Sequence, residues 1–337
     1  MIREAIQQVM AGNDLTEAEM IETMNEIMEG KTTDAQIACF LTALRLKGET
    51  IEEITGAARV MRDKATPVPT KHSLVVDTCS TGGTGLSLFN ISTTSAFVVA
   101  GAGVPVAKHG NRGVTRQSGS ANVLMALGVN IEISPEHVGQ CIDEGGIGFL
   151  FAPALHGAMK YAIGPRREIG IRTIFNALGP LTNPAGAQAQ VLGVYAPELT
   201  ETHANVLNNL GCRRAFVVHG DDGLDEITTT TTTRVSELRN GTVKTYTLDA
   251  TAFGIPNAES AALLGGSPEE NAEITVNILS GEKGPKRDIV VLNAGAAIVA
   301  GGKADNLDAG IELASESIDS GAALAKLEGL KRVSNNF

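Results

Sequence analysis

The first 66 residues carry only helical patterns of apolar and polar positions. After Thr33, apolar residues recur at positions 37, 40, 41 and 44, the spacing of one helix face. Three threonines stand three residues before Glu or Gln, a capping-box pattern that satisfies free N–H groups at a helix start. They are Thr16 with Glu19, Thr33 with Gln36, and Thr50 with Glu53. We therefore expect four short helices, which alone would bury little core.

Beyond a connector, short apolar runs alternate with helix-like stretches. The connector, TPVPTKHS at 66–73, has two prolines and no periodicity. Ser134-Pro135 then opens a helix that runs through Cys141, with proline at the first helical position. The alternation predicts a mainly parallel sheet with helices on both faces. The predicted strands are 74–77, 104–107, 130–133, 147–152, 190–195 and 214–219.

Near residue 234 the pattern changes to strand-like alternation around Asn240-Gly241, which predicts a type I′ hairpin and an antiparallel addition to the sheet. Six threonines at 228–233 favour extended backbone, and we interpret them as part of a loop or strand with no separate function. The later run DIVVLNAGAAIVAGG fits either a strand or a buried helix. The whole pattern predicts an α/β protein. A small N-terminal α-helical domain, 1–70, is joined by a helical segment near 165–185, and a large α/β domain spans 71–337.

Composition narrows the class of function. The 337 residues suffice for about two domains. A net charge of −11 argues against a nucleic-acid or anionic-membrane partner. The N-terminus has acids and no long apolar core, and no apolar run reaches about 18 residues, so we expect neither a signal peptide nor a membrane span. Four widely spaced cysteines predict reduced thiols, and with the preceding features a cytoplasmic protein.

The first candidate site is the glycine-rich stretch DTCSTGGTGLSLFNIST at 77–93, which lacks the lysine of a P-loop. The glycines of Thr81-Gly82-Gly83 would let backbone N–H groups approach an anion. Asn90, Ser92 and Thr93 fall at the next helix start, where hydroxyls and the helix dipole favour phosphate. A plain structural turn explains this stretch equally well.

The second candidate, KHGNRGVTRQSGSANVL at 108–124, supplies the missing positive charge directly after the predicted strand 104–107. Its polar residues fall within nine positions, and the intervening glycines indicate a tight, shaped backbone. A solvated charged loop is the alternative. The residues concerned are Lys108, His109, Asn111, Arg112 and Arg116.

Two further stretches complete the set. In residues 155–184 the guanidinium groups of Arg166, Arg167 and Arg172 could grip a carboxylate, with His156 nearby, although such residues also brace helices. In HGDDGLDEI, 219–227, four acids offer oxygen ligands for Mg²⁺, or form a simple acidic turn. No nucleophilic triad is evident. The chemistry predicted is phosphate positioning and charge stabilisation rather than covalent catalysis.

Together these motifs resemble the anthranilate phosphoribosyltransferase family. The matching stretches are TGG…FNIST, KHGNR…SGS, GIRTIFNALGPLTNP and HG.DGLDEIT, in the family's order and spacing. The resemblance implies a homodimer of hinged two-domain chains. It also implies transfer of the phosphoribosyl group of phosphoribosyl pyrophosphate (PRPP) to the anthranilate amine, with Mg²⁺ on the diphosphate.

The resemblance also implies roles for individual residues. Those that would bind PRPP are Ser80, Thr81, Gly82, Gly83, Asn90, Ser92, Thr93, Lys108 and Ser120. Those that would line the anthranilate path are His109, Asn111, His156, Arg166 and Pro180, with Arg166 near the carboxylate. Lys108 and Arg166 would contribute most to catalysis, by charge and positioning. The Mg²⁺ ligands would be Ser92, Asp225 and Glu226.

The chain departs from the family pattern at several positions. Ser80 and Thr84 stand where Gly and Asp are usual, Asn122 and Met125 replace acids, and Arg116 replaces a small residue. These changes predict a more positive site that depends less on Mg²⁺, or a different aromatic amine as acceptor. A nucleoside phosphorylase-like enzyme and a non-catalytic nucleic-acid binder also compete with this interpretation. The sequence KHGNR and the net charge, respectively, argue against these two.

Overall fold

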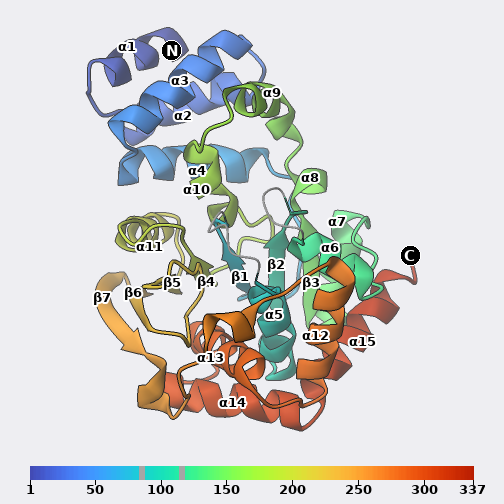
Figure 1. Cartoon of the computed structure of the whole chain (residues 1–337). Coiled ribbons are helices and arrows are strands. Elements are labelled where there is room, and N and C mark those ends of the chain that lie inside the picture. The colour runs from blue at the N-terminus through green and yellow to red at the C-terminus, as the bar shows by residue number, and fades with distance from the viewer. Residues whose placement is uncertain (83–87, 114–117) are drawn as a thin grey trace.

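The N-terminal helices form a bundle at one end of the molecule (Figure 1). The structure is a computed structural model that describes residues 1–82, 88–113 and 118–337. All three predicted capping boxes are formed, each with the threonine hydroxyl and the Glu or Gln side chain satisfying backbone N–H groups. The four predicted helices are α1 (Ile2–Met10), α2 (Glu17–Met28), α3 (Asp34–Lys47) and α4 (Ile51–Lys64).

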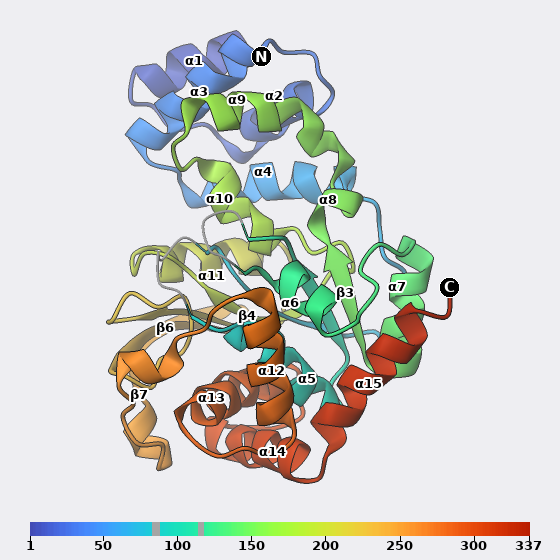
Figure 2. The same ribbon diagram turned by 45° about the vertical axis from the view of Figure 1, so that its right-hand side comes forward.

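Two later helices pack on this bundle. Helix α9 (Lys160–Ile169) contacts α2 and α3, and α10 (Ile174–Leu178) lies between α4 and the strands (Figures 1 and 2). The turn after α2 has Gly30 at φ +70°, and a Cβ there would lie 2.5 Å from the Tyr161 ring. Only glycine therefore lets α9 approach so closely. The domain limits at 70 and 71, with the joining segment near 165–185, stay a prediction.

The described strands form one seven-stranded sheet in the order β3-β2-β1-β4-β5-β6-β7. Strands β1 to β5 are parallel, and β6 and β7 add an antiparallel hairpin at the edge. Its turn has Asn240 at φ 51° and Gly241 at φ 78°, so the predicted type I′ turn is confirmed. The strands are β1 (Val76–Ser80), β2 (Val106–Gly110), β3 (Ile147–Phe151), β4 (Ala189–Gly193), β5 (Arg214–Gly220), β6 (Thr232–Arg239) and β7 (Thr242–Asp249).

Helices cover both faces of the sheet, as predicted (Figure 2). On one face α5 and α13 pack on Val76, Val106 and Val191, and α14 and α15 pack on these helices; on the other face, α11 packs on Leu192 and Val217. The remaining helices are α5 (Ile91–Gly101), α6 (Ser120–Ala126), α7 (Pro135–Gln140), α8 (Ala152–Leu155), α11 (Leu199–Asn209), α12 (Pro268–Leu279), α13 (Pro285–Ala300), α14 (Leu307–Asp319) and α15 (Ala322–Ser334). The run DIVVLNAGAAIVAGG thus lies in the buried helix α13 and its C-terminal turn, and no described helix is long and apolar enough to cross a membrane.

The predicted strand at 130–133 is wrong: this segment is irregular. Its polar backbone groups bond to side chains instead of a neighbouring strand. The Asn130 N–H donates to Ser334 Oγ at 3.1 Å, and the Glu132 N–H donates to Asn130 Oδ1 at 3.2 Å. Ile131 is buried in the main core. The alternation of polar and apolar residues therefore reflects burial of a loop against helices.

Candidate active site

Three of the candidate motifs meet at the carboxyl ends of the parallel strands, beside the point where the strand order reverses between β1 and β4. The Thr81 N–H extends the β1–β4 ladder by donating to the Gly193 carbonyl at 2.9 Å. The Thr81 hydroxyl in turn accepts the Tyr195 N–H at 3.0 Å. Gly82 follows at φ +66° with open space around it. The start of the glycine loop is thus anchored to β4, with Ser80 at the end of β1; Gly83 and Thr84 lie outside the described residues.

The N-terminus of α5 faces the same edge. Asn90 is its N-cap residue, and its side-chain carbonyl accepts from Asn271 Nδ2 at 3.1 Å and Ser118 Oγ at 3.3 Å. Thr93 in the first turn is 1% exposed, and its hydroxyl has no partner among the described residues. Its side chain borders a closed apolar space with Phe97 and Leu124, so the predicted role of Thr93 in binding phosphate stays a prediction.

Lys108 is 3% exposed and reaches into this region from β2. Its ammonium donates to the Thr78 carbonyl at 2.5 Å and to Ser92 Oγ at 3.4 Å. Burial lowers the pKa of Lys108, and the negative charges of Asp77 and Glu226 oppose that shift. The expected positive charge therefore lies beside the α5 N-terminus, within electrostatic reach of the acidic turn.

The strand that carries Lys108 lies two to three residues further along the chain than the predicted 104–107, since β2 begins at Val106. Strand β2 ends at Gly110, so Lys108 and His109 are strand residues and do not follow the strand. The reason is that β2 and β3 pair as far as Gly110 with Phe151. A prediction based on runs of apolar residues ends a strand at the first charged residue, and so it missed Lys108. The backbone hydrogen bonds between β2 and β3 fix the position of Lys108 in the strand.

His109 and His156 form a buried pair. Their Nε2 atoms are 3.1 Å apart, and the residues are 7% and 8% exposed. Burial lowers the pKa of His109 to about 3, helped by His156, and burial lowers the pKa of His156 to about 4. Both rings are therefore neutral at pH 7, with one donating and the other accepting.

The loop after β2 is closed by side chains of α6. The Asn111 carbonyl accepts from the Ala121 N–H at 3.1 Å and from Ser120 Oγ at 3.3 Å. Asn122 Oδ1 accepts the N–H groups of Gly113 at 3.0 Å and Gly119 at 3.1 Å. A neutral amide thus performs this closure; Arg116, inside the loop, lies outside the described residues.

The other residues predicted to line the anthranilate path lie on the segment between bundle and sheet. The Arg166 guanidinium stacks over the Phe175 ring, 5.0 Å from its centre, and burial lowers the pKa of Arg166. Pro180 lies in the turn after α10, and its carbonyl accepts from Gln190 Nε2 at 2.7 Å. Arg172 lies 4.4 Å over the Tyr195 ring, whereas Arg167 is exposed.

The acidic turn after β5 divides its acids into two pairs. Asp222 accepts from the hydroxyls of Thr228 and Thr230, and Asp221 accepts from Thr232, so the threonine run braces this turn. Asp225 is 1% exposed, and its carbonyl packs against Gly193 so closely that a Cβ there would collide with it. The turn is therefore fixed against β4, with Asp225 and Glu226 as its remaining carboxylates.

The oxygen donors of this region suit a Mg²⁺ ion that is bound partly by the protein and partly by water and substrate phosphate. Among the described residues no group of three or more His, Cys, Asp or Glu gathers as a metal cage. Mg²⁺ usually keeps several waters and binds through one or two carboxylates with substrate phosphates. Asp225 and Glu226, with the Ser92 hydroxyl beside Lys108, fit that mode and not a site made of protein ligands alone.

Sequence reasoning missed two buried residues, Asp77 and Asn183. Asp77 is 0% exposed and accepts from the His109 N–H and Asn183 Nδ2. One signal was present: a single acid directly follows the apolar run at 74–76. A carboxylate in a buried strand needs donors, which only the folded chain identifies.

Comparison with known proteins gives a consistent assignment. The helical bundle domain model of the glycosyl transferase family matches residues 3–65, and its a/b domain model matches residues 72–324. An anthranilate phosphoribosyltransferase from Moorella thermoacetica is 58% identical over 98% of this chain and 97% of its own. The relative of that name from Acetivibrio thermocellus is 57% identical over 100% and 98%.

Solved structures agree. The crystal structure of anthranilate phosphoribosyltransferase from Thermus thermophilus superposes with a TM-score of 0.94 at 44% identity, covering 98% of this chain and 99% of that one. The enzyme from Saccharomyces cerevisiae in complex with PRPP and Mg gives a TM-score of 0.91 at 28% identity, covering 100% and 98%. This chain therefore belongs to the anthranilate phosphoribosyltransferase family.

Proposed function

We propose that this chain transfers the phosphoribosyl group of PRPP to the amine of anthranilate and releases pyrophosphate, with Mg²⁺ on the diphosphate. The observation that carries the proposal is the meeting of Lys108 with the α5 N-terminus, next to the buried pair of His109 and His156. One strand, β2, thus presents a cation for a phosphate and a neutral polar ring for an aromatic amine. The names of the relatives support the same reaction.

At the donor end, the diphosphate would lie on the first turn of α5. The Ser92 hydroxyl and the Lys108 ammonium lie at this turn, and the Gly82 N–H begins the adjacent loop. Asp225, Glu226 and Ser92 would hold Mg²⁺, which neutralises charge on the departing diphosphate when bound. The S. cerevisiae enzyme in complex with PRPP and Mg supports a donor that binds together with magnesium.

At the acceptor end, anthranilate would lie between the His109–His156 pair and Arg166. A guanidinium binds a carboxylate bidentately, and stacking on Phe175 restrains the Arg166 side chain. Asn111 and Pro180 would complete the path. The S. cerevisiae enzyme in complex with 4-fluoroanthranilate supports a ligand of this chemical class.

The reaction needs charge stabilisation and orientation more than covalent help. As diphosphate leaves, the sugar carbon gains positive character, and Lys108 with the helix N-terminus stabilises the departing negative charge. Neutral His109 and His156 can accept or donate hydrogen bonds without adding a charge near that carbon. Arg166 holds the weakly nucleophilic amine in line, which reduces the entropic part of the barrier.

The proposal is tested by acceptor-dependent pyrophosphate release. Purified chain with PRPP and Mg²⁺ should release pyrophosphate rapidly with anthranilate and slowly with aniline, which lacks the carboxylate. Equal rates with both amines would reject Arg166 as the carboxylate ligand and point to another aromatic acceptor. No release with either amine would reject the transferase proposal.

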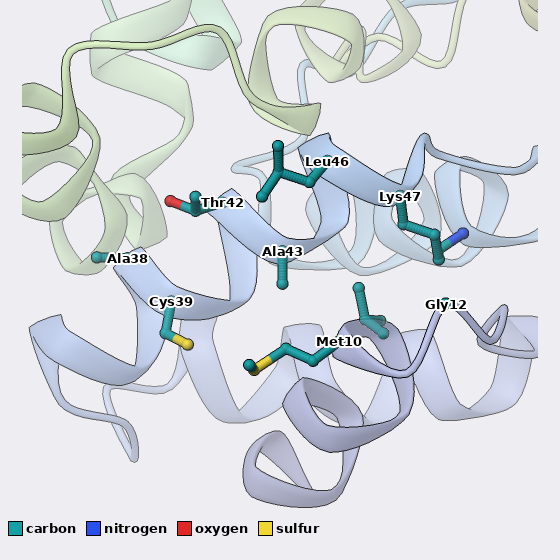
Figure 3. A pocket seen from close by; sticks show the side chains of 9 residues that line it. Met10, Gly12, Ala38, Cys39, Thr42, Ala43, Leu46 and Lys47 are labelled. Carbon is teal, nitrogen blue, oxygen red and sulfur yellow. The ribbon is translucent and has the colours of Figure 1, made fainter.

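We also propose that two copies of the chain associate through the helical bundle. Helices α1 and α3 border an apolar groove of about 640 Å³, shown in Figure 3. Met10 at 69% and Leu46 at 83% exposure lie on it, and exposed apolar residues of this size are typical of an interface. The cytoplasmic location stays a prediction.

Light scattering after size exclusion tests this second proposal. The wild type should have twice the chain mass of 35.0 kDa, and Leu46→Glu should shift the protein toward monomer because it buries a charge in the interface. A control, Leu264→Glu, changes an equally apolar residue that is 48% exposed elsewhere on the surface. A monomeric wild type would contradict the proposal.

A further inference from the structure

Strands β1 and β2 separate immediately after they pair. Their register joins only Val76 to Val106, whereas β1 pairs with β4 along all of Val76–Ser80. Beyond that point side chains replace the ladder. The His109 N–H donates to Asp77 Oδ1 at 3.1 Å, and the Lys108 ammonium donates to the Thr78 carbonyl at 2.5 Å. The two site residues of β2 are thus held to β1 by side-chain bonds.

Asn183 fills the gap between the separated strands. Its Nδ2 donates to Asp77 Oδ2 and to the Ala107 carbonyl, both at 2.8 Å, and its Oδ1 accepts the Ala185 N–H at 2.9 Å. A backbone carbonyl only accepts and a backbone N–H only donates, so Ala107 and Ala185 fix this orientation of the amide. Asp77 is 0% and Asn183 4% exposed, and the two bonds that Asn183 Nδ2 donates are buried.

The segment that carries Asn183 is one of three chain crossings between the helical bundle and the sheet. Its neighbour Pro184 accepts the Val68 N–H from the 66–73 connector at 3.0 Å. The same connector binds the end of α8, where the Thr66 N–H donates to the Leu155 carbonyl at 2.8 Å. The 66–73 connector is therefore hydrogen-bonded to both of the other crossings, and Asn183 bonds to β1 and β2.

We infer that Asp77 and Asn183 form a positioning pair that sets Lys108 and His109 relative to the crossings between bundle and sheet. Neither residue touches substrate; both act through β2. The inference rests on the proposed function, since its consequence is the placement of the donor cation and the acceptor-side histidine. A purely structural pair would affect folding stability alone.

Three variants separate these roles. Asp77→Asn leaves one carbonyl oxygen to meet two donors, the His109 N–H and Asn183 Nδ2, so one bond is lost. Asn183→Asp instead places a second carboxylate opposite that of Asp77, where the amide of Asn183 lies 2.8 Å from Asp77 Oδ2. The double variant restores a donor opposite an acceptor, because the amide at position 77 then donates to the carboxylate at 183.

We expect each single variant to lower kcat about tenfold or more, because a shift of Lys108 and His109 by a fraction of an ångström spoils their alignment with the reacting groups. KM for anthranilate should change by a smaller factor than kcat, because Arg166, the proposed carboxylate ligand, lies on α9 and not on β2. The double variant should recover at least about threefold in kcat over Asn183→Asp. Asp249→Asn, which changes an exposed carboxylate that caps a distant turn, is the matched control.

Hydrogen exchange gives a readout that needs no turnover. Peptides containing the Val68 and His109 amides should exchange faster in Asp77→Asn than in the wild type and the Asp249→Asn control. An inactive wild type would reject the proposed function. The hydrogen exchange of Asp77→Asn would then still show whether Asp77 and Asn183 fix the position of β2. Normal kcat and normal exchange in a folded Asp77→Asn protein, or normal kcat with only a lower Tm, would overturn the inference.

Discussion

At the scale of single residues, the site depends on buried groups whose charge is set by their surroundings. The clearest case is the neutral pair of His109 and His156, whose pKa values fall to about 3 and about 4. The unfolded chain binds protons on these rings at a higher pH than the folded chain does. Their contribution to stability is therefore present above pH 6.5 and is lost as the pH falls toward 4.

This pair should make unfolding strongly pH-dependent. Between pH 7 and about pH 4.5, we expect His156→Gln to lose about 2–3 kcal/mol less unfolding free energy than the wild type. Urea titrations at a series of pH values measure this difference. His72→Gln, at a histidine whose side chain is 36% exposed, is the control. Parallel curves for the wild type and His156→Gln would show that the pair does not carry the effect.

Asn122 is the second residue-scale case. Its amide oxygen closes the loop after β2 without the negative charge of the acid usual in the family. Asn122→Asp keeps both hydrogen bonds and adds one charge. We expect the ratio of turnover at saturating Mg²⁺ to turnover at low Mg²⁺ to rise about threefold in this variant, because the added charge repels the diphosphate until metal neutralises it. Mg²⁺ titration of turnover measures it; a steep and equal Mg²⁺ requirement in both proteins would contradict the prediction.

At the scale of elements, the sequence predicted correctly those features that depend only on residues close together in the chain. The capping boxes at Thr16, Thr33 and Thr50, and the Asn240-Gly241 turn, each need only neighbouring residues, and all are formed. The end of β2 and the irregular segment at 130–133 depend on a partner strand or on distant side chains. These two predictions failed because periodicity reports burial and not hydrogen-bond partners.

The contact between β4 and the acidic turn yields an element-scale prediction. In Gly193→Ala the new Cβ would lie 1.7 Å from the Asp225 carbonyl oxygen, so the turn that carries Asp225 and Glu226 must move. We expect kcat/KM for PRPP to fall at least about tenfold and stability to fall by about 1–3 kcal/mol. Steady-state kinetics and urea unfolding measure these effects. Gly329→Ala, where nothing lies within 4 Å, should be neutral or slightly stabilising; an active Gly193→Ala would contradict the account.

At the scale of the whole molecule, the sequence predicted which segments form the site but not how they are joined. The motifs at 80–82, 108–111 and 225–226 each follow or end a strand, so a parallel sheet brings them to one edge. The placement of individual site residues stays a prediction. Asp77 and Asn183 are 106 positions apart, and no spacing rule connects them. Their role depends on the separation of β1 from β2, a property of the assembled sheet.

The most direct test of the central claim is the loss of anthranilate fluorescence on mixing the chain with anthranilate, PRPP and Mg²⁺. We predict rapid loss for the wild type and for the control Arg167→Ala, which changes the exposed neighbour. Arg166→Ala should slow the loss by about 10- to 100-fold, the usual effect of removing a charge-assisted pair. Unchanged fluorescence with the wild type, although calorimetry detects PRPP binding, would contradict anthranilate as the acceptor.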